Sequence, residues 1–270
     1  MTLYSEEHLT EESAMQLLEQ MGWQKFNAYH GERFGAEGSL GRDSEREVVL
    51  KYRVRDAIER INPGLPDQAY EKSQERLTRH DASKTLEQNN HSNYLLVKNG
   101  VPVDYRDDEG RIIRGKRIRA IDFEDPENNE FLAVQQLWVQ VDLYKRRPDV
   151  ILYVNGLPLV FFEFKAHSVD VQAAYTGNLK DYKHTIPQAF FHNGFIILSN
   201  GTQSKIGSIT SGYEHFKDWK RITEEERGRI SLETILKGTC SKKNLLDIYE
   251  NFILYDTSEG GVVKLVAMNH

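Results

Sequence analysis

The stretch Arg147–His167, "RPDVILYVNGLPLVFFEFKAH", is almost wholly apolar, yet it carries ionisable side chains at both of its ends. Asp149 stands near the beginning, and Glu163 and Lys165 stand near the end. The apolar residues predict two strands of a sheet that is covered on both faces. Unpaired charge is costly to bury, so the presence of these three side chains needs a physical reason.

The register of the two strands decides whether their charges meet. A strict two-residue turn at "NG" would place Asp149 and Glu163 on opposite faces of the sheet. A three-residue loop with a bulge at Gly156 would pair Tyr153 with Leu157 and bring both acids to one face. We therefore predict the bulged hairpin.

A cluster of Asp149, Glu163 and Lys165 at strand ends suggests a divalent metal site. Glu163 and Lys165 are two residues apart, so they share a face in any register. Two close carboxylates repel each other, and a hard cation such as Mg²⁺ removes that repulsion. The alternative is a buried ion pair of Lys165 with one acid. Two acids against one base would leave the cluster negative, which favours the metal.

The spacing of these residues resembles a nuclease motif. Pro148-Asp149, thirteen intervening residues and then Glu163-Phe164-Lys165 look like PD-(D/E)xK. The stretches "NNEFLAVQQLWV" and "IPQAFFHNGFIILSNGTQSKIGS" add a wider likeness. The chain is similar, from roughly residue 10 to its end, to the N-terminal nuclease domain of the restriction (R) subunit of type I restriction-modification enzymes.

This resemblance implies a fold, an activity and partners. The fold would be α/β, a mixed sheet flanked by helices, and the activity Mg²⁺-dependent cleavage of double-stranded DNA. An ATP-driven motor would follow in the same polypeptide, so ATP would serve the motor and not this chain. Separate methylation and specificity subunits would recognise the DNA site.

The resemblance also implies roles for individual residues. Asp149 and Glu163 become metal ligands, the Phe164 carbonyl a further ligand, and Lys165 the catalytic lysine. The family places an acid on the first helix, and Glu11 matches best; the alternative is an ordinary first-turn acid favoured by the helix dipole.

A second group of residues is expected to contact DNA or to regulate the site. The family has Gln-x-x-x-Tyr after the lysine, whereas this chain has Asn178 and Tyr182, and the shorter amide puts the role of Asn178 in doubt. Lys183, Arg146 and Arg147 are candidates for phosphate contacts, with solvated surface positions as the alternative.

We expect one nuclease domain over 1–270. It would have a helical N-terminal part (about 1–90), a catalytic α/β core (about 91–212) and a C-terminal helical segment with a terminal strand (about 213–270). The abrupt end suggests a fragment of a longer chain, with a natural C-terminus as the alternative. The predicted helices are 10–21, 43–61, 66–88, 168–184 and 223–253; the predicted strands lie in a hairpin at 101–123 and at 129–143, 194–200, 204–209 and 260–270, besides the opening stretch.

Composition sets limits on the class of protein. The 270 residues carry a net charge of −6, which argues against a general nucleic-acid coat protein. No apolar run is long enough to span a membrane, and the acidic N-terminus lacks a secretory signal. A single cysteine, Cys240, excludes an intrachain disulfide, and we expect a cytoplasmic protein.

Two other functions stay open. The domain would be mainly a docking and regulatory module of the same complex, with little activity alone, or it would be a PD-(D/E)xK nuclease of another repair or defence system. Helicase motifs beyond residue 270 would support the assignment to the restriction subunit, and their absence would rule that assignment out.

Overall fold

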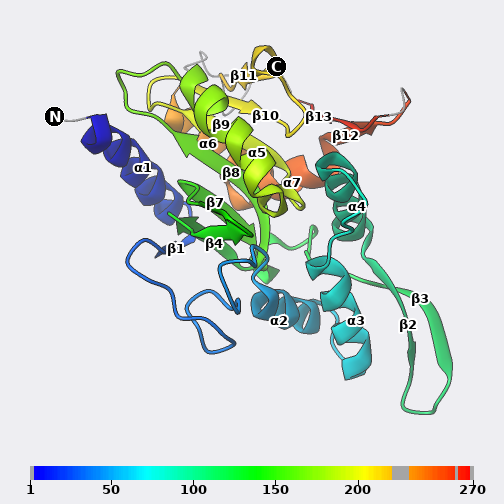
Figure 1. Cartoon of the computed structure of the whole chain (residues 1–270). Helices are drawn as coiled ribbons and strands as arrows, with labels where there is room; N and C mark the ends of the chain where they lie inside the picture. The colour runs from blue at the N-terminus through cyan, green and yellow to red at the C-terminus, as the bar shows by residue number, and fades with distance from the viewer. Residues whose placement is uncertain (1–2, 221–230, 259–260, 268–270) are drawn as a thin grey trace.

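The computed structural model describes residues 3–220, 231–258 and 261–267, and its centre is a mixed seven-stranded sheet flanked by helices (Figure 1). The strand order is β1-β4-β7-β8-β9-β10-β11. The pairs β1/β4 and β8/β9 are parallel, and the other neighbours are antiparallel. The strands are β1 Gln24–Asn27, β4 Phe131–Gln135, β7 Val150–Val154, β8 Leu157–Phe164, β9 Phe195–Ser199, β10 Ser204–Gly207 and β11 Lys217–Asp218. The predicted α/β class is confirmed.

Helices and three small hairpins surround this sheet. The helices are α1 Leu3–Gln20, α2 Lys51–Ile61, α3 Asp67–Thr78, α4 Leu86–Asn99, the π-helical turn η2 Ala174–Leu179, α5 Lys180–Thr185, α6 Leu232–Cys240 and α7 Lys242–Asn251, with short 3₁₀ turns η1 Pro126–Asn128, η3 Pro187–Phe190 and η4 Tyr213–His215. The hairpins are β2 Val101–Arg106 with β3 Ile112–Ile118, β5 Val139–Val141 with β6 Tyr144–Arg146, and β12 Ile253–Asp256 with β13 Val263–Val266.

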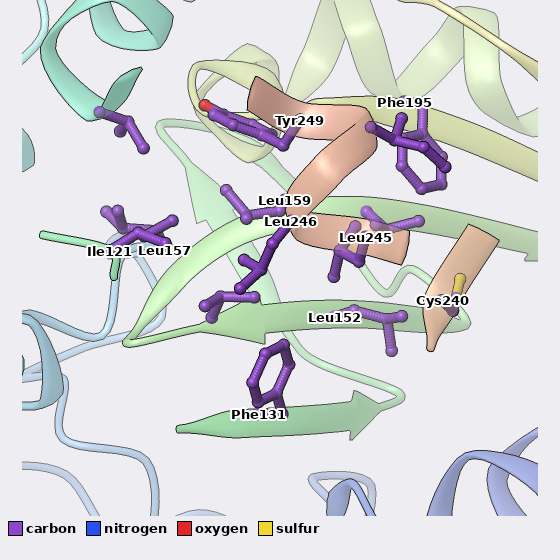
Figure 2. Packing of buried hydrophobic residues seen from close by; sticks show 14 of the residues in the cluster. Ile121, Phe131, Leu152, Leu157, Leu159, Phe195, Cys240, Leu245, Leu246 and Tyr249 are labelled. Atoms are coloured by element: carbon purple, nitrogen blue, oxygen red, sulfur yellow. The ribbon is translucent and has the colours of Figure 1, made fainter. Parts of the chain in front are cut away.

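Two hydrophobic clusters pack on the sheet. One contains residues of α1, α6 and α7, and Figure 2 shows Leu245 and Leu246 of α7 lying over Leu152 and Leu159 of the sheet. The other contains residues of η2, α5 and the 28–50 loop. Because apolar side chains leave both faces of β7 and β8, these strands are buried along their whole length.

The hairpin between β7 and β8 has a tight two-residue turn. Val154 pairs with Leu157, and the turn residues Asn155 and Gly156 have φ values of 50° and 79°. Positive φ at both central positions is the geometry that Asn-Gly favours in hairpins. The predicted three-residue loop with a bulge at Gly156 is therefore wrong.

The extra residue of this hairpin lies further along β8. Tyr153 pairs with Pro158 and Leu152 with Val160, so Leu159 is the bulged residue. Its carbonyl accepts hydrogen bonds from Gly194 N at 2.6 Å and Asn193 Nδ2 at 3.3 Å. The bulge shifts the register by one residue, as the sequence prediction required, but at a different position.

Two predicted helices have different bounds. The helix expected over 43–61 begins only at Lys51, because residues 42–50 form a loop fixed by a buried arginine. The helix expected over 66–88 ends at Thr78, and a second helix missed by the sequence reading begins after Thr85. Thr85 and Gln88 form a capping box there, which is a strong helix start.

The strand predicted over 129–143 is two strands. Gln136 has a φ of 57°, which breaks the run after β4 and sends β5 into a separate hairpin with β6. The predictions for 101–123, 194–200 and 204–209 are confirmed as β2–β3, β9 and β10. The helix expected over 168–184 begins only at Ala174, as η2 followed by α5. Residues 223–230 of the predicted 223–253 helix lie outside the described residues, and its described part is two helices, α6 and α7, separated at Ser241.

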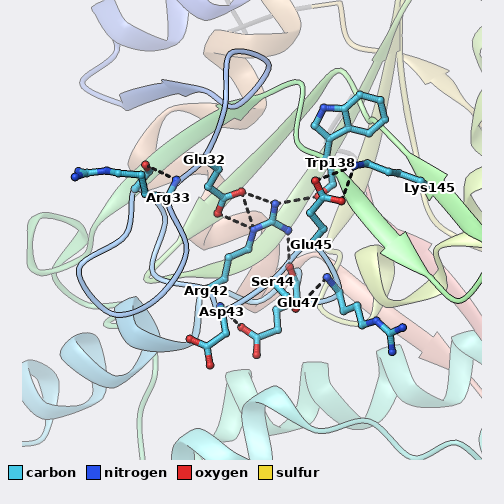
Figure 3. A network of polar contacts seen from close by, with 11 residues as sticks. Glu32, Arg33, Arg42, Asp43, Ser44, Glu45, Glu47, Trp138 and Lys145 are labelled. Carbon is cyan, nitrogen blue, oxygen red and sulfur yellow. Dashed lines mark hydrogen bonds and ion pairs between the residues drawn. The ribbon is translucent and has the colours of Figure 1, made fainter.

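The 28–50 loop is held by the buried side chain of Arg42 (Figure 3). Arg42 is 0% exposed, and its guanidinium donates hydrogen bonds to both carboxylate oxygens of Glu32, at 2.6–3.0 Å. It also donates to the carbonyls of Glu47 at 2.7 Å and Trp138 at 2.9 Å. One side chain thus ties two parts of the loop to the segment that leads into β5.

We expect Arg42→Met to destabilise the chain by about 3–5 kcal/mol, because it leaves the Glu32 carboxylate buried without its partner. Urea unfolding of the purified chain measures this. Arg33→Met, at an exposed position of the same loop, should change stability by about 0.5 kcal/mol or less. An Arg42→Met chain as stable as the Arg33→Met control would contradict the assigned role of the network.

Candidate functional site

The bulge in β8 brings Asp149 and Glu163 to the same face of the sheet. Val150 pairs with Phe162, so the next pair in this register is Asp149 with Glu163, at the end of the hairpin away from its turn. Asp149 Oδ2 accepts a hydrogen bond of 2.7 Å from the backbone N–H of Phe164. This bond fixes the half-buried carboxylate against the end of β8.

Glu163 is 0% exposed and has polar partners from two elements. Its Oε1 accepts a hydrogen bond from the Asn178 side-chain amide on η2. The Lys165 ammonium lies 3.6 Å from the same oxygen. Asn178, which stands where the family has Gln, therefore reaches the carboxylate directly despite its shorter side chain.

Glu11 on α1 joins the two strand residues through Gln136. The Gln136 amide nitrogen lies 2.9 and 2.8 Å from the two carboxylate oxygens of Glu11 and 3.3 Å from Asp149 Oδ1. Burial and the charge of Asp149 raise the pKa of Glu11 to about 7, while the Gln136 amide acts in the opposite direction. One N–H₂ group thus bridges two carboxyl groups that repel each other.

These residues surround a cavity of about 400 Å³. Its wall includes Glu11, Asp149, Lys165, Asn178 and Tyr182. Glu163 lies beneath this wall, covered by its two polar partners. The cavity places one buried and two wall carboxyl groups beside the cations Lys165 and Arg147, so carboxyl groups outnumber the Lys and Arg side chains there.

The other predicted contact residues differ in their surroundings. Arg147 lines the cavity, and its carbonyl accepts a hydrogen bond from Tyr182 Oη at 3.4 Å. Arg146 forms a two-bond ion pair with Asp181 on α5. Lys183 Nζ donates to the Ile209 carbonyl at 2.9 Å, and burial lowers the pKa of its ammonium. Arg146 and Lys183 therefore make contacts within the fold, whereas Arg147 faces the cavity.

Sequence reasoning missed several residues of the cavity. Gln136 is the most important, and its signal was present as a Gln-Gln pair that ends an apolar strand. Tyr29 and His30 also line the cavity, from the loop after β1. Nothing in their local sequence points to the site, because only the tertiary fold brings that loop beside Asp149.

Among residues 3–220, 231–258 and 261–267, no three His, Cys, Asp or Glu side chains are grouped closely enough to hold a metal ion by themselves. Within the same ranges, no helix combines the length and apolar character that crossing a bilayer requires.

Comparison with known proteins identifies the family. Residues 3–215 match the model described as type I restriction enzyme R protein N terminus. The HindI endonuclease subunit of a Haemophilus influenzae type I restriction enzyme is 32% identical over 96% of this chain. A Methanocaldococcus jannaschii protein, provisionally named the MjaIXP endonuclease subunit of a type I restriction enzyme, is 27% identical over 93%.

The match covers only part of each relative. The chain spans 25% of the Haemophilus influenzae protein and 26% of the Methanocaldococcus jannaschii protein, about a quarter of their length. The family model, in contrast, covers most of the chain and includes every element that forms the cavity. The chain belongs to the family of type I restriction enzyme R protein N-terminal domains.

Proposed function

We propose that this chain is a Mg²⁺-dependent nuclease domain that hydrolyses phosphodiester bonds of double-stranded DNA. The observation that carries the proposal is the pairing of Asp149 with Glu163 at the end of two buried strands, with Lys165 beside them. A buried lysine–acid pair alone would need one carboxylate. The site has three: Glu11 and Asp149 line a cavity open to a ligand, and Glu163 is buried beneath its wall.

The residues present fit a hard divalent cation. Every hydrogen-bond partner described above for these carboxylates is a donor: the amides of Gln136 and Asn178 and the Phe164 N–H. Burial and, after it, the charge of Asp149 raise the pKa of Glu11, and a cation bound beside these carboxyl groups would lower it. Mg²⁺ commonly uses one or two carboxylates and completes its shell with water and phosphate oxygens, so a cluster of three acidic ligands is not required.

Asp149 and Glu163 would hold the ion, with the Phe164 carbonyl as a third oxygen. When bound, the ion would neutralise charge on the phosphate and make water a better nucleophile. Lys165 supplies a point charge that would orient the attacking water or hold the phosphate. Asn178 keeps the Glu163 carboxylate in place, and Glu11 acts on Asp149 through Gln136.

The wider assignment follows from the family. The complete protein would continue into an ATP-driven motor and would act in the cytoplasm with methylation and specificity subunits that select the DNA. The relatives' names as endonuclease subunits of type I restriction enzymes support this assignment. ATP would then be a cofactor of the motor and not of this domain.

We expect Asp149→Asn to lower DNA cleavage by the assembled enzyme by about 100-fold or more, because a charge at the reacting centre is lost at constant size. ATP hydrolysis by the same assembly should be unchanged. Gel analysis of plasmid cleavage, beside a coupled ATPase assay, measures both rates. Asp108→Asn, at the exposed β2–β3 turn, is the matched control and should cut at the wild-type rate.

A normal cleavage rate for Asp149→Asn would remove the nuclease assignment and leave the docking and regulatory function. If Asp149→Asn is inactive but the sequence beyond residue 270 lacks helicase motifs, the nuclease would belong to another repair or defence system.

In the presence of a chelator, which keeps the chain free of metal, the titration of Glu11 should lower the unfolding free energy of the chain as the pH rises. Between about pH 4.5, the unshifted value, and about 7 the folded chain keeps the Glu11 proton and the unfolded chain releases it. The unfolding free energy should therefore drop across this window, by about 3 kcal/mol at 1.36 kcal/mol per pKa unit. Glu11→Gln should gain stability relative to wild type by that amount at pH 8.

Urea unfolding at pH 4.5, 6 and 8 in EDTA measures the difference between the two chains. Glu12→Gln, at the neighbouring position on α1, is the matched control and should follow the wild-type curve. A constant difference between Glu11→Gln and wild type at all three pH values would contradict the raised pKa.

A further inference from the structure

Four side chains form an alternating row of cations and rings that ends in the cavity; we call Lys145, Trp138, Arg147 and Tyr29 the cation–aromatic strip. Lys145 Nζ lies 4.6 Å from the centre of the Trp138 ring. The Arg147 guanidinium carbon lies 5.0 Å from the same ring and 4.7 Å from the Tyr29 ring. These distances are within the range of cation–π attraction.

The strip connects an exposed hairpin to the catalytic residues. Lys145 is exposed on β6, where its ammonium also forms an ion pair with Glu45 at 2.7 Å, and Trp138 lies just before β5. Arg147 and Tyr29 line the same cavity as Asp149. Arg147 is also only two residues before Asp149, so the row leads along the chain directly to the site.

The Arg147 guanidinium is held without using its hydrogen-bond donors. Among the described residues, no carboxylate or carbonyl forms an ion pair or hydrogen bond with this group, and its charge acts on the Glu11 carboxyl, whose pKa it lowers. The guanidinium groups of Arg42 and Arg146, in contrast, donate hydrogen bonds to the carboxylates of Glu32 and Asp181, respectively. Two ring faces position Arg147, and its planar fork of N–H groups stays available, which suits a phosphate.

The supports of the strip are fixed by the fold. The buried Arg42 binds the Trp138 carbonyl and Glu32, which is three residues after Tyr29 (Figure 3). Tyr182 donates to the Arg147 carbonyl. The ring positions are therefore set before a ligand arrives, so ordering costs little when one binds.

We propose that the cation–aromatic strip binds the sugar–phosphate backbone of the DNA strand being cut, and that Arg147 grips a phosphate next to the scissile one. Tyr29 and Trp138 are positioning residues that hold the guanidinium. This inference rests on the proposed nuclease function and adds the surface by which the substrate reaches the site. The alternative is packing that only stiffens the β5–β6 hairpin.

The first test is Arg147→Lys in the complete R subunit, assembled with its partner subunits on plasmid DNA. Lysine keeps the charge but loses the planar fork and the ring stacking. Cleavage should fall by about 10-fold or more while ATP hydrolysis stays at the wild-type rate. The matched control is Arg114→Lys, at an exposed position of β3 outside the strip, which should cut normally.

The positioning residues are tested by pairs of variants at one site. Tyr29→Phe keeps the ring and should cut close to the wild-type rate, whereas Tyr29→Leu should lose several-fold in cleavage rate. Likewise, Trp138→Phe should cut DNA faster than Trp138→Leu, because phenylalanine keeps a ring at this position. Equal rates for the ring-keeping and ring-removing variants would contradict the role of the rings.

Photocrosslinking supplies a measurement that does not depend on cleavage. A p-benzoyl-phenylalanine placed at Tyr29 should crosslink to DNA in the assembled complex. The same group at Phe34, which is on the same loop and 45% exposed against 47% for Tyr29, should not. The Arg147→Gln substitution should lower the yield at Tyr29 several-fold. Equal crosslinking yields at Tyr29 and Phe34 would contradict the proposal that the cation–aromatic strip binds DNA.

The two proposals fail in different ways. If Asp149→Asn abolishes cleavage but Arg147→Lys cuts at the wild-type rate, the nuclease stands and the strip is wrong. If Asp149→Asn cuts normally, the nuclease function is lost, and with it the substrate that the strip was inferred to bind.

Discussion

The site depends on one extra residue in β8. The tight turn after β7 would leave Asp149 and Glu163 on opposite faces, and the bulge at Leu159 reverses that for every residue beyond it. The bulge is supported from β9, where the N–H of Gly194 binds the Leu159 carbonyl at 2.6 Å. A side chain at Gly194 would meet the Tyr249 ring at 2.9 Å, so the close approach of these segments needs glycine.

Once the register is set, electrostatics shapes the rest of the site. Glu11 and Asp149 repel each other across the Gln136 amide, and Glu163 is buried at the end of β8. The fold answers with amides and with Lys165, and it does not provide a matching number of cations. The amides hold the carboxylates in position, and under the proposed function a divalent ion would compensate the remaining charge. The Arg147 guanidinium is held by the Tyr29 and Trp138 rings, so under the proposal its N–H donors would be available to the substrate.

The sequence predicted which residues of β7 and β8 come together better than it predicted the backbone geometry that brings them together. Asp149, Glu163 and Lys165 could be found because charge in an apolar run is conspicuous, and their shared face was predicted. The position of the bulge could not be, because it depends on Asn193 and Gly194, more than thirty residues away. Gln136, Tyr29 and Trp138 were missed for the same reason: they reach the site only through the strand order and the loop held by Arg42.

The most direct measurement is anomalous diffraction from crystals of the chain soaked with Mn²⁺, which has the same preference for oxygen ligands as Mg²⁺. The paired carboxylates predict a peak between Asp149 and Glu163, about 2.0–2.3 Å from an oxygen of each. The peak should be absent from crystals of Asp149→Asn. The metal site would be contradicted if well-ordered crystals showed Mn²⁺ bound at full occupancy at another position and no anomalous peak between Asp149 and Glu163.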